Sequence, residues 1–398
     1  MAKCSNEKDI TPKMTNQQIC TRCIMDASVP GIKFDSDGVC SHCRFQEMLE
    51  NEYPLNEEGA KNLEQLVAKI KKAGQGRKYD CVAGISGGRD STYTIHQLVT
   101  RFGLRPLAVH FNDGFGNPTA GQNMKKACDK LGVELRTITS DWRESKDIRI
   151  SFLKASTPDL PEGTDVGIGA ALYGVAAKEG IKYVTIGQSF RTEGVCPLEW
   201  NYLDGKYLKA VHRQFGTYPL RKGTLEDPGF NLDLWRMFQY VVLKGIKVVP
   251  ILYYVDYVRA DVDKLISEEL DWVNTGAHYY DDLYQCLMTN LLRVKFGIDR
   301  RIFNYSALVR SGQMTREEAL ERTSGVYEIE DPDVIRLCIK RLGLSQKQFD
   351  EFVHMPPKTF KDYPSNYNLI RLFKLPIWLL ATLKVIPKTA YSKYFWFN

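Results

Sequence analysis

The segment from Gly84 to Thr92, which reads Gly-Ile-Ser-Gly-Gly-Arg-Asp-Ser-Thr, constrains the fold of this chain more than any other feature. It follows an apolar run that predicts a buried strand, and it opens a stretch with helical periodicity. The backbone N–H groups of residues 86–88 can face inward around an anion, and the positive end of the following helix points to the same place. This order of elements predicts a phosphate-binding loop, for which a glycine-rich turn without a ligand is the alternative.

The side chains of this phosphate loop indicate how it would treat a phosphate. Asp90, in the first turn of the helix, can hold Mg²⁺ against the anion. Ser91 can cap the helix or hydrogen-bond the phosphate. The loop is not of the Walker type, because the chain contains no Gly-Lys followed by Ser or Thr.

Short apolar runs alternate with longer helical stretches around this loop. Strands are predicted at 79–85, 106–111, 133–138 and 182–186, and helices at 57–73, 91–102, 119–131 and 167–178. The alternation predicts an α/β fold with a doubly wound parallel sheet, covered by helices on both faces. His110 and Asn112 end one strand, and Gly187 and Gln188 end another, so we expect all four near the loop, where such sheets bind ligands.

Two close cysteine pairs lie near the start of the chain. Cys20 and Cys23 are followed, after sixteen residues, by Cys40 and Cys43. The surrounding segment has too few apolar residues to hold itself together. The spacing therefore predicts a zinc-ribbon-like module at 15–50 with a closed, structural Zn²⁺ site. His42 can replace one cysteine as a ligand, but an outward-facing position in the turn is favoured.

Length and charge set further limits. The 398 residues suffice for two or three domains. Beyond the cysteine module we expect a catalytic domain at 57–260 and a mostly helical region at 261–365, with amphipathic helices at 281–296 and 315–322.

The net charge of +6 belongs to residues 358–398, which hold seven basic residues and one acid, so the rest is neutral. Nucleic acid is therefore not an expected partner. The polar start and the lack of a long apolar run predict a cytoplasmic protein.

Several blocks of sequence together resemble the N-acetyl sugar amidotransferases, a family of surface-polysaccharide biosynthesis within the ATP pyrophosphatase superfamily. The phosphate loop Ser86-Gly-Gly-Arg-Asp-Ser91 is typical of the superfamily. The narrower resemblance rests on the cysteine module, on Gly187-Gln-Ser-Phe-Arg-Thr-Glu-Gly194, and on Lys295-Phe-Gly-Ile-Asp-Arg-Arg301 followed by Ser311-Gly-Gln-Met-Thr-Arg-Glu-Glu-Ala319. It extends from Cys20 to Pro364, which is most of the chain.

This resemblance implies a PP-loop ATPase fold of the adenine nucleotide alpha hydrolase type, with ATP and Mg²⁺ as cofactors. It also implies that the acetamido group of a nucleotide-activated sugar becomes an acetamidino group, in lipopolysaccharide O-antigen or related surface-glycan biosynthesis. AMP would be transferred to the amide oxygen as pyrophosphate leaves, and ammonia would then displace AMP. The predicted catalytic residues are Ser86, Asp90 and Ser91.

The resemblance also suggests which residues bind each ligand. The residues expected to hold the nucleotide are Gly84, Ser86, Gly87, Gly88, Arg89, Asp90, Ser91, His110, Asn112, Gly187 and Gln188. The residues expected to bind the anionic sugar nucleotide are Arg191, Glu193, Tyr280, Lys295, Arg300 and Arg301, because arginine suits bidentate binding of phosphate and carboxylate groups. An ordinary strand-end histidine is the alternative for His110, and a solvated helix end is the alternative for the basic set at 295–301.

No cysteine of the chain lies in a recognisable glutaminase context. The resemblance therefore implies that glutaminase and cyclase-like partner subunits supply the ammonia. A tRNA thiolase is the main rival, although Cys128 and Cys196 form no recognised redox or cluster motif. A nitrile synthase-like enzyme of 7-deazaguanine metabolism and a non-catalytic zinc scaffold are further alternatives.

The tail at 366–398 combines basic and aromatic residues, and Pro376 and Pro387 interrupt it. It can pack as helices on the catalytic domain, dock the ammonia-supplying partner, or make a peripheral contact with an anionic membrane. We favour packing, because hydrophobic stripes usually belong to a core.

Overall fold

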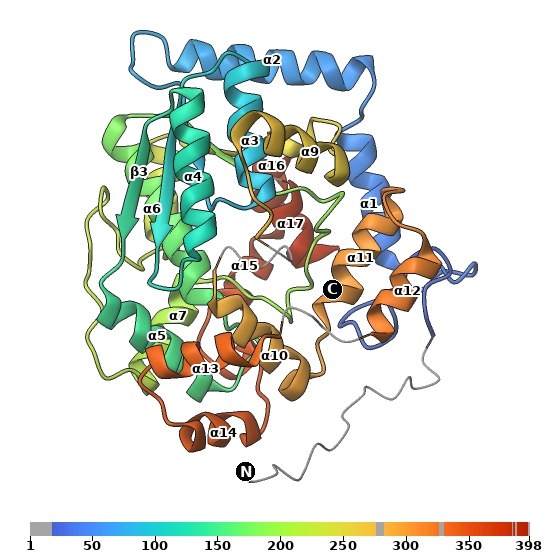
Figure 1. Ribbon diagram of the computed structural model, residues 1–398, viewed down its shortest axis with the longest axis vertical. Helices are drawn as coiled ribbons and strands as arrows, with labels where there is room; N and C mark the ends of the chain where they lie inside the picture. Colours follow the sequence, from blue (N-terminus) through green and yellow to red (C-terminus); the bar gives the residue numbers. More distant parts are fainter. Residues whose placement is uncertain (1–17, 276–281, 326–329, 384, 387, 397–398) are drawn as a thin grey trace.

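A parallel five-stranded sheet forms the centre of the computed structural model, which describes residues 18–275, 282–325, 330–383, 385–386 and 388–396 (Figure 1). The strand order is β3-β2-β1-β4-β5. These strands are β1 (Cys81–Gly84), β2 (Pro106–Asn112), β3 (Leu135–Thr139), β4 (Tyr183–Ile186) and β5 (Lys247–Pro250). Because β2 and β4 both pair with β1, the chain changes direction across the sheet at β1. Ligands of such sheets bind beside this reversal, at the carboxyl ends of the strands.

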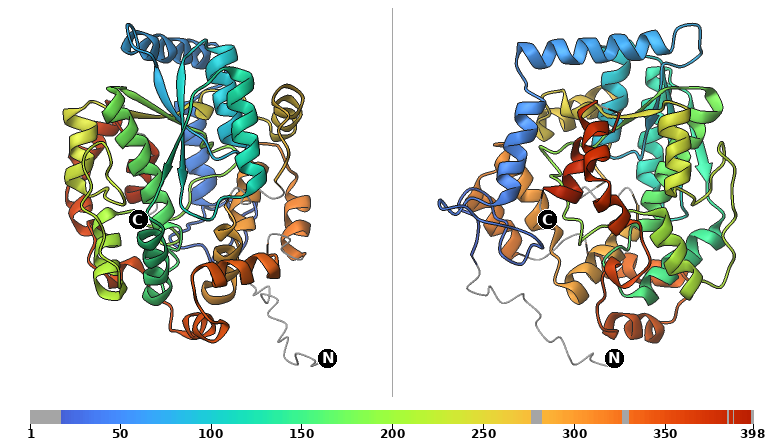
Figure 2. Two further views of the ribbon diagram at one scale, coloured as in Figure 1. Left: turned by 60° about the vertical axis from the view of Figure 1, so that its left-hand side comes forward. Right: turned by 180° about the vertical axis from the view of Figure 1, so that it is seen from behind.

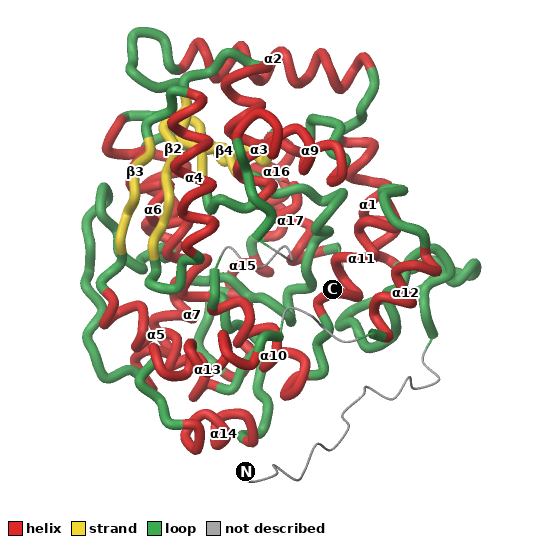
Figure 3. The backbone as a smooth tube through the Cα atoms, viewed as in Figure 1, coloured by secondary structure: helices red, strands yellow, loops and turns green. Residues whose placement is uncertain are grey.

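Helices cover both faces of the sheet (Figure 3). One face carries α2 (Glu57–Ala73), α3 (Arg89–His96), α4 (Pro118–Leu131) and α9 (Arg259–Leu270), and the other carries α6 (Glu162–Glu179). Cys81 and Ala83 of β1 join the core under the first group, whereas Val82 between them packs with α6. Side chains alternate along a strand, so both faces of β1 are buried. The predicted doubly wound α/β fold is confirmed.

The four predicted strands and the helices between them are present, with ends shifted by a few residues. The elements that were not predicted include β5 and α5 (Trp142–Ala155). β5 has only four residues. α5 has no clean apolar stripe because it buries polar side chains, including Ser145, Asp147 and Arg149. The remaining elements of this domain are α7 (Gly205–Phe215), α8 (Leu234–Phe238), the π-helical turns Gln97–Arg101 and Gln239–Leu243, and the 3-10 turn Ile251–Tyr253.

The chain beyond α9 is helical, as predicted. Its helices are α10 (Tyr284–Phe296), α11 (Arg300–Arg310), α12 (Arg316–Ser324), α13 (Pro332–Arg341) and α14 (Gln346–His354), followed by the 3-10 turn Phe360–Asp362. α10 and α12 confirm the two predicted amphipathic helices, and the Thr315 hydroxyl caps α12 by accepting from the Glu318 N–H at 3.1 Å. The cysteine module, with α1 (Ser41–Glu52), lies beside α11 and α12 (Figure 1).

The tail folds into α15 (Tyr367–Leu372), α16 (Lys374–Thr382) and α17 (Lys388–Phe395), and only part of it packs as expected. Tyr367 is buried, and Trp396 lies 5.5 Å from Phe45 of α1, ring centroid to centroid. Most large apolar side chains of α16 instead point to solvent, and Ala381 is its buried residue. The expectation that the apolar stripe of the tail is core is therefore wrong for α16. Among the described residues, no helix combines the length and apolarity needed to cross a membrane.

The phosphate loop passes too close to α4 for a side chain at Gly87. The φ angle of Gly87 is +83°, and a Cβ there would lie 2.0 Å from the Ala120 carbonyl oxygen. We expect Gly87→Ala to lower the free energy of unfolding by about 2 kcal/mol or more, from strain and steric conflict together. Gly121→Ala, one residue further on α4, meets no atom within 4 Å and should be neutral or slightly stabilising. Chemical denaturation of both variants measures the difference, and equal stabilities would contradict this account.

Candidate active site

A cavity of about 220 Å³ opens at the carboxyl ends of β1, β2 and β4. Six of the residues predicted to hold the nucleotide line it: Gly84, Ser86, Ser91, His110, Asn112 and Gly187. The strand order explains this meeting, because β2 and β4 both neighbour β1 and all three strands end at the same edge. Sequence reasoning thus placed these residues in one site, which we call the first cavity.

The phosphate loop is held by contacts on its outer side. The Gly87 carbonyl accepts hydrogen bonds from the Trp272 indole at 3.0 Å and from the Asn123 amide at 3.1 Å. A trans peptide directs its C=O and N–H groups opposite ways, so this anchoring turns the next N–H away from α4. That N–H, of Gly88, donates to the Ser86 hydroxyl at 3.3 Å, and the Ser86 and Ser91 hydroxyl oxygens lie 3.1 Å apart. The loop is therefore ordered by its own side chains and by α4 and the chain after α9.

Asp90 lies behind the loop, in contact with two side chains from other parts of the chain. The Tyr257 hydroxyl donates to the Asp90 carboxyl group, and the carboxyl group of Glu193 shares a hydrogen bond with it. Burial raises the pKa of Glu193. Two carboxyl groups in contact share either a proton or a cation, and an all-oxygen donor set of this kind fits Mg²⁺.

The approach of Glu193 to Asp90 depends on a glycine. A Cβ at Gly187, at the end of β4, would lie 2.9 Å from the Asp90 carbonyl carbon and the Ser91 nitrogen. Only a residue without a side chain lets the start of the β4 loop run against the first turn of α3 at this distance. The loop 187–194 therefore starts directly beside the end of the phosphate loop.

A second cavity, of about 310 Å³, lies on the other side of loop 187–194. Three predicted residues line it, Gln188, Glu193 and Arg300. The positive charge of Arg300 lowers the pKa of Glu193, against the larger effect of burial. The other polar residues of its lining are Asp165, Asn201 and Asn304. The second cavity thus combines one cation with carboxyl and amide groups. It neighbours the first cavity, because Gly187 lines the first and the next residue, Gln188, lines the second.

Two residues predicted to bind ligands form contacts within the fold. The Arg89 guanidinium forms a salt bridge with Asp263 of α9, and one nitrogen lies 2.7 Å from the carboxylate. Arg191 donates to the carbonyl oxygens of Tyr253 at 3.0 Å and Tyr53 at 2.8 Å. Neither arginine lines the first or the second cavity, and their predicted ligand contacts stay predictions.

The basic set around residue 300 is divided in the same way. Arg301 pairs with Asp299 and donates to carbonyl oxygens at the end of α12, at 2.7 Å for that of Gly325. Lys295 donates to the Phe352 carbonyl oxygen, and burial lowers its pKa to about 8. Neither lines the first or the second cavity, so their predicted substrate contacts are not supported. Tyr280 lies outside the described residues.

A charged cluster at the rim of the first cavity was not predicted. Asp113 and Asp282 line the cavity, and the buried Arg149 forms an ion pair with Asp113. The Thr164 hydroxyl also donates to Asp113, at 2.8 Å. Burial, and then the negative charge of Asp113, raises the pKa of Asp282 to about 8. The position of Asp113, directly after the strand-end residue Asn112, was the available sequence signal.

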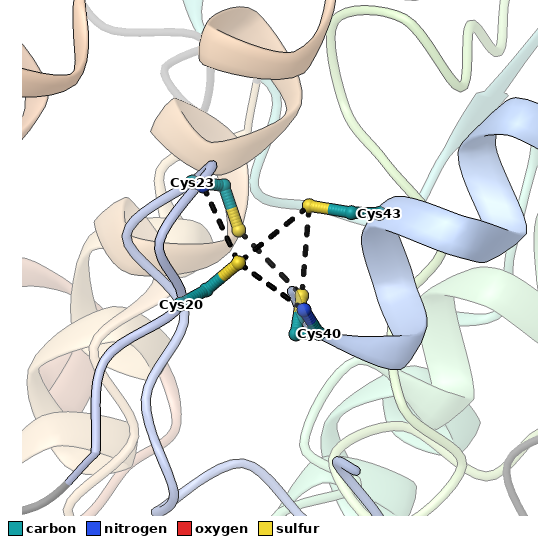
Figure 4. Close-up of side chains that lie close together, drawn as sticks. All are labelled: Cys20, Cys23, Cys40 and Cys43. Atoms are coloured by element: carbon teal, nitrogen blue, oxygen red, sulfur yellow. Dashed lines mark hydrogen bonds between the residues drawn. The ribbon is translucent and has the colours of Figure 1, made fainter. Parts of the chain in front are cut away.

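The four predicted zinc ligands meet as a buried cluster (Figure 4). The sulfur atoms of Cys20 and Cys43 are 3.8 Å apart, those of Cys23 and Cys40 3.7 Å, and those of Cys40 and Cys43 3.6 Å. Sulfur atoms about 2.3 Å from a tetrahedral Zn²⁺ are separated by about 3.8 Å. The cluster therefore fits a tetrahedral metal ion, and its identity as zinc stays a prediction.

The surroundings of the cluster explain where the cysteine module docks. Arg310 of α11 donates to the Cys23 sulfur at 3.7 Å, and Arg316 of α12 donates to the Cys20 carbonyl oxygen at 3.1 Å. The cysteines share one hydrophobic core with α10, α11, α13 and α14. His42 is buried, so the expected outward-facing position of this residue is wrong.

Residues 277–375 match the family described as LPS biosynthesis protein WbpG-like, C-terminal domain. The similarity is limited to this part of the chain. The match confirms the resemblance to proteins of surface-polysaccharide biosynthesis that the sequence showed. It covers α10 to α15, and so includes Arg300 and Asn304 of the second cavity.

One relative matches a limited part of the chain. An uncharacterised protein of Methanocaldococcus jannaschii, MJ1599, is 28% identical over 127 residues, which are 31% of this chain and 44% of the relative. The match thus spans less than half the length of that relative.

Solved structures with a similar arrangement include an NH3-dependent NAD synthetase from Campylobacter jejuni (14% identity, TM-score 0.31, 75% of this chain and 98% of that chain). A U34-tRNA thiolase from Methanococcus maripaludis with its 4Fe-4S cluster has the same identity and TM-score, over 70% of this chain and 84% of that chain. A predicted subunit of a tRNA methyltransferase from M. jannaschii is also 14% identical, with a TM-score of 0.28, over 56% and 91% of the two chains. At these identities and TM-scores, the similarities support no conclusion about the function of this chain.

Loss of one cysteine of the cluster should release the metal and weaken the shared core. We expect Cys40→Ser to lower the free energy of unfolding by about 4 kcal/mol or more, because a closed metal site contributes directly to folding. Metal content by mass spectrometry and chemical denaturation check this together. Cys286→Ser is the matched control, since Cys286 is also buried but lies outside the cluster. A Cys40→Ser protein that keeps its metal would contradict the assignment.

The raised pKa of Asp282 predicts a pH-dependent stability. Its pKa in the folded protein is about 8, whereas the ordinary value is about 4. Between these two pH values the folded state holds a proton that the unfolded state has released. The stability that this proton gives to the folded state is fully present below about pH 4 and is lost as the pH rises through about 8. We expect Asp282→Asn to flatten the decline in thermal stability between these values. Asp129→Asn, at an exposed position on α4, should leave the slope as it is, and an unchanged slope in Asp282→Asn would refute the assignment.

Proposed function

We propose that this protein is an ATP-dependent amidotransferase that converts an acetamido group of a nucleotide-activated sugar into an acetamidino group. The observation that carries the proposal is the meeting of two cavities at loop 187–194, with Asp90 and Glu193 in contact between them. One cavity is bordered by a phosphate loop, and the other is built partly from a domain similar to LPS biosynthesis proteins. An enzyme that joins a nucleotide to a sugar substrate needs this adjacency.

The first cavity suits ATP. The loop at residues 86–88 and the start of α3 would bind the phosphates, with the Ser91 hydroxyl beside them. The Ser86 and Gly88 N–H groups, which donate to the Ser91 and Ser86 hydroxyls in the structure, would exchange these partners for phosphate oxygens. His110 donates from Nδ1 to the Ile85 carbonyl oxygen at 3.1 Å, and burial lowers its pKa, so the neutral ring presents Nε2 as an acceptor. That acceptor suits an adenosine amino or hydroxyl group. Asp90 and Glu193 would hold Mg²⁺, which offsets charge on the phosphates.

The second cavity suits the sugar nucleotide. Arg300 would bind an anionic group of the substrate, and Asn201 and Asn304 offer amide groups to its hydroxyls. Gln188 lies at the border between the cavities, where the acetamido oxygen would meet the α-phosphate. The oxygen attacks the α-phosphorus and pyrophosphate leaves; ammonia then adds to the activated carbon, and the C–O bond breaks to release AMP. The chain's part is to position both substrates and stabilise charge, which needs no covalent nucleophile.

The nitrogen would come from partner subunits. Among the described residues, the cysteines outside the metal cluster do not gather into a second group. Cys196 lines the second cavity, but burial raises the pKa of its thiol, which leaves it a poor nucleophile. We therefore propose that glutaminase and cyclase-like subunits deliver ammonia to the second cavity.

The same cysteines bear on the rival thiolase. Cys128 of α4 packs in the core against the sheet, whereas Cys196 lies in the second cavity. Burial raises the pKa of Cys128 to about 12. Two inert thiols in separate places do not form the redox pair that sulfur transfer to tRNA would use, and we rank this function second.

The reaction is tested by incubating the protein with ATP, Mg²⁺, an ammonium salt and a UDP- or CMP-linked acetamido sugar. We expect AMP, pyrophosphate and a sugar whose mass is lower by the difference between O and NH. Asp90→Asn should slow product formation by about 100-fold or more, because charge stabilisation at the phosphates is lost.

Asp261→Asn, exposed at the start of α9, serves as the matched control and should keep full activity. Pyrophosphate release with tRNA but with none of the sugars would favour the thiolase. No ATP consumption with any of these substrates would refute both functions.

A further inference from the structure

Two helical segments far apart in the sequence present large apolar side chains to solvent. In α15, α16 and the turn after them, the exposed fractions include 81% for Leu372, 76% for Leu375, 50% for Trp378 and 61% for Leu383. In α8 and the π-helical turn 239–243, they include 64% for Trp235 and 64% for Leu243. Both segments lie on the same side of the molecule, which faces the viewer in the right panel of Figure 2.

This exposure is concentrated rather than scattered. Of the 21 exposed large apolar side chains in the described part of the chain, twelve belong to these two segments. They are Leu234, Trp235, Phe238, Val242 and Leu243 in the first segment, and Leu369, Leu372, Phe373, Leu375, Trp378, Leu379 and Leu383 in the second. Single exposed apolar residues are ordinary on a protein surface, but a set of this size marks a contact site.

Within the two segments the charged residues are all basic, whereas Asp233, directly before the first segment, is paired with Lys209. Residues 234–247 contain Arg236, Lys244 and Lys247 and no acid, and residues 363–398 contain five basic residues and no acid. Arg371 and Lys374 are exposed within the second segment. Arg371 lies over the Tyr367 ring at 5.6 Å and Lys374 over the Phe395 ring at 5.7 Å, so both cations are held along the apolar surface.

We propose that this surface, made of residues 234–247 and 369–383, docks on the anionic face of a lipid membrane. Leucine and aromatic side chains with flanking cations suit the boundary between headgroups and acyl chains. The uniform positive sign favours acidic phospholipid over a protein partner, whose surface would mix both charges. α16 has nine residues, about 14 Å of helix, so it can lie in the interface but cannot span an apolar layer of about 30 Å. The inference does not depend on the proposed reaction.

The test is co-sedimentation of the full chain with phosphatidylcholine vesicles, with and without phosphatidylglycerol. We expect binding to the anionic vesicles at low salt, weaker binding at high salt, and little binding to the neutral vesicles. Arg371→Gln with Lys374→Gln should weaken binding roughly 30-fold, since each basic residue near the surface contributes about 1 kcal/mol. Leu375→Ser with Trp378→Ser and Leu379→Ser should abolish it.

Leu337→Ser with Val294→Ser, at exposed apolar positions outside the surface, is the matched control and should bind like the native protein. Circular dichroism confirms that each variant is folded. A native protein that stays in solution with anionic vesicles at low salt would overturn the proposal. So would a dimer, seen by light scattering, that the triple variant dissociates while vesicle binding is absent, because a second copy would then cover the surface.

Discussion

The close approach of β4 to the start of α3 is the constraint on which the rest of the site depends. β4 pairs with β1, so the loop after β4 begins beside the phosphate loop after β1. Gly187 permits this approach, because a Cβ there would lie only 2.9 Å from the backbone of Asp90 and Ser91. Six residues later, the same loop brings Glu193 to Asp90 and forms one wall of the second cavity. Strand pairing and one missing side chain thus decide where both cavities lie.

Side chains of the C-terminal domain contact both the cysteine cluster and the chain beside Asp90. In α11 and the turn after it, Arg310 contacts the cysteine cluster, and the Gln313 amide donates to the Tyr257 carbonyl oxygen at 2.8 Å. The hydroxyl of Tyr257 in turn donates to Asp90. The metal-binding module is therefore linked to the phosphate loop through a short series of contacts. This gives a structural cluster at the edge of the molecule a physical route by which it can support the active site, although it lines neither cavity.

The features that a local sequence pattern specifies were predicted, whereas those that depend on contacts between distant parts of the chain were missed. The phosphate loop, four strands and the cysteine cluster each have a spacing that specifies them. The sequence could not separate Arg300, which lines a cavity, from Arg89, Arg191 and Arg301. A sequence does not show which arginine is paired with a carboxylate or carbonyl group inside the protein. Tyr257 was missed because it follows β5, a strand that the sequence pattern did not reveal. The outward side chains of α16 were missed because an apolar stripe looks the same whether or not another element covers it.

The charges around the first cavity determine how it can bind a triphosphate. Its described lining contains Asp113 and Asp282 but no lysine or arginine, and the nearby Arg149 is already paired with Asp113. The neutral body of the protein supplies no general positive field either. The negative charge of a nucleotide must therefore be offset by loop N–H groups, by the start of α3 and by a bound cation, all of which act at short range. Asp282, with its raised pKa, adds no full negative charge near neutral pH, which limits the repulsion that such a ligand would meet.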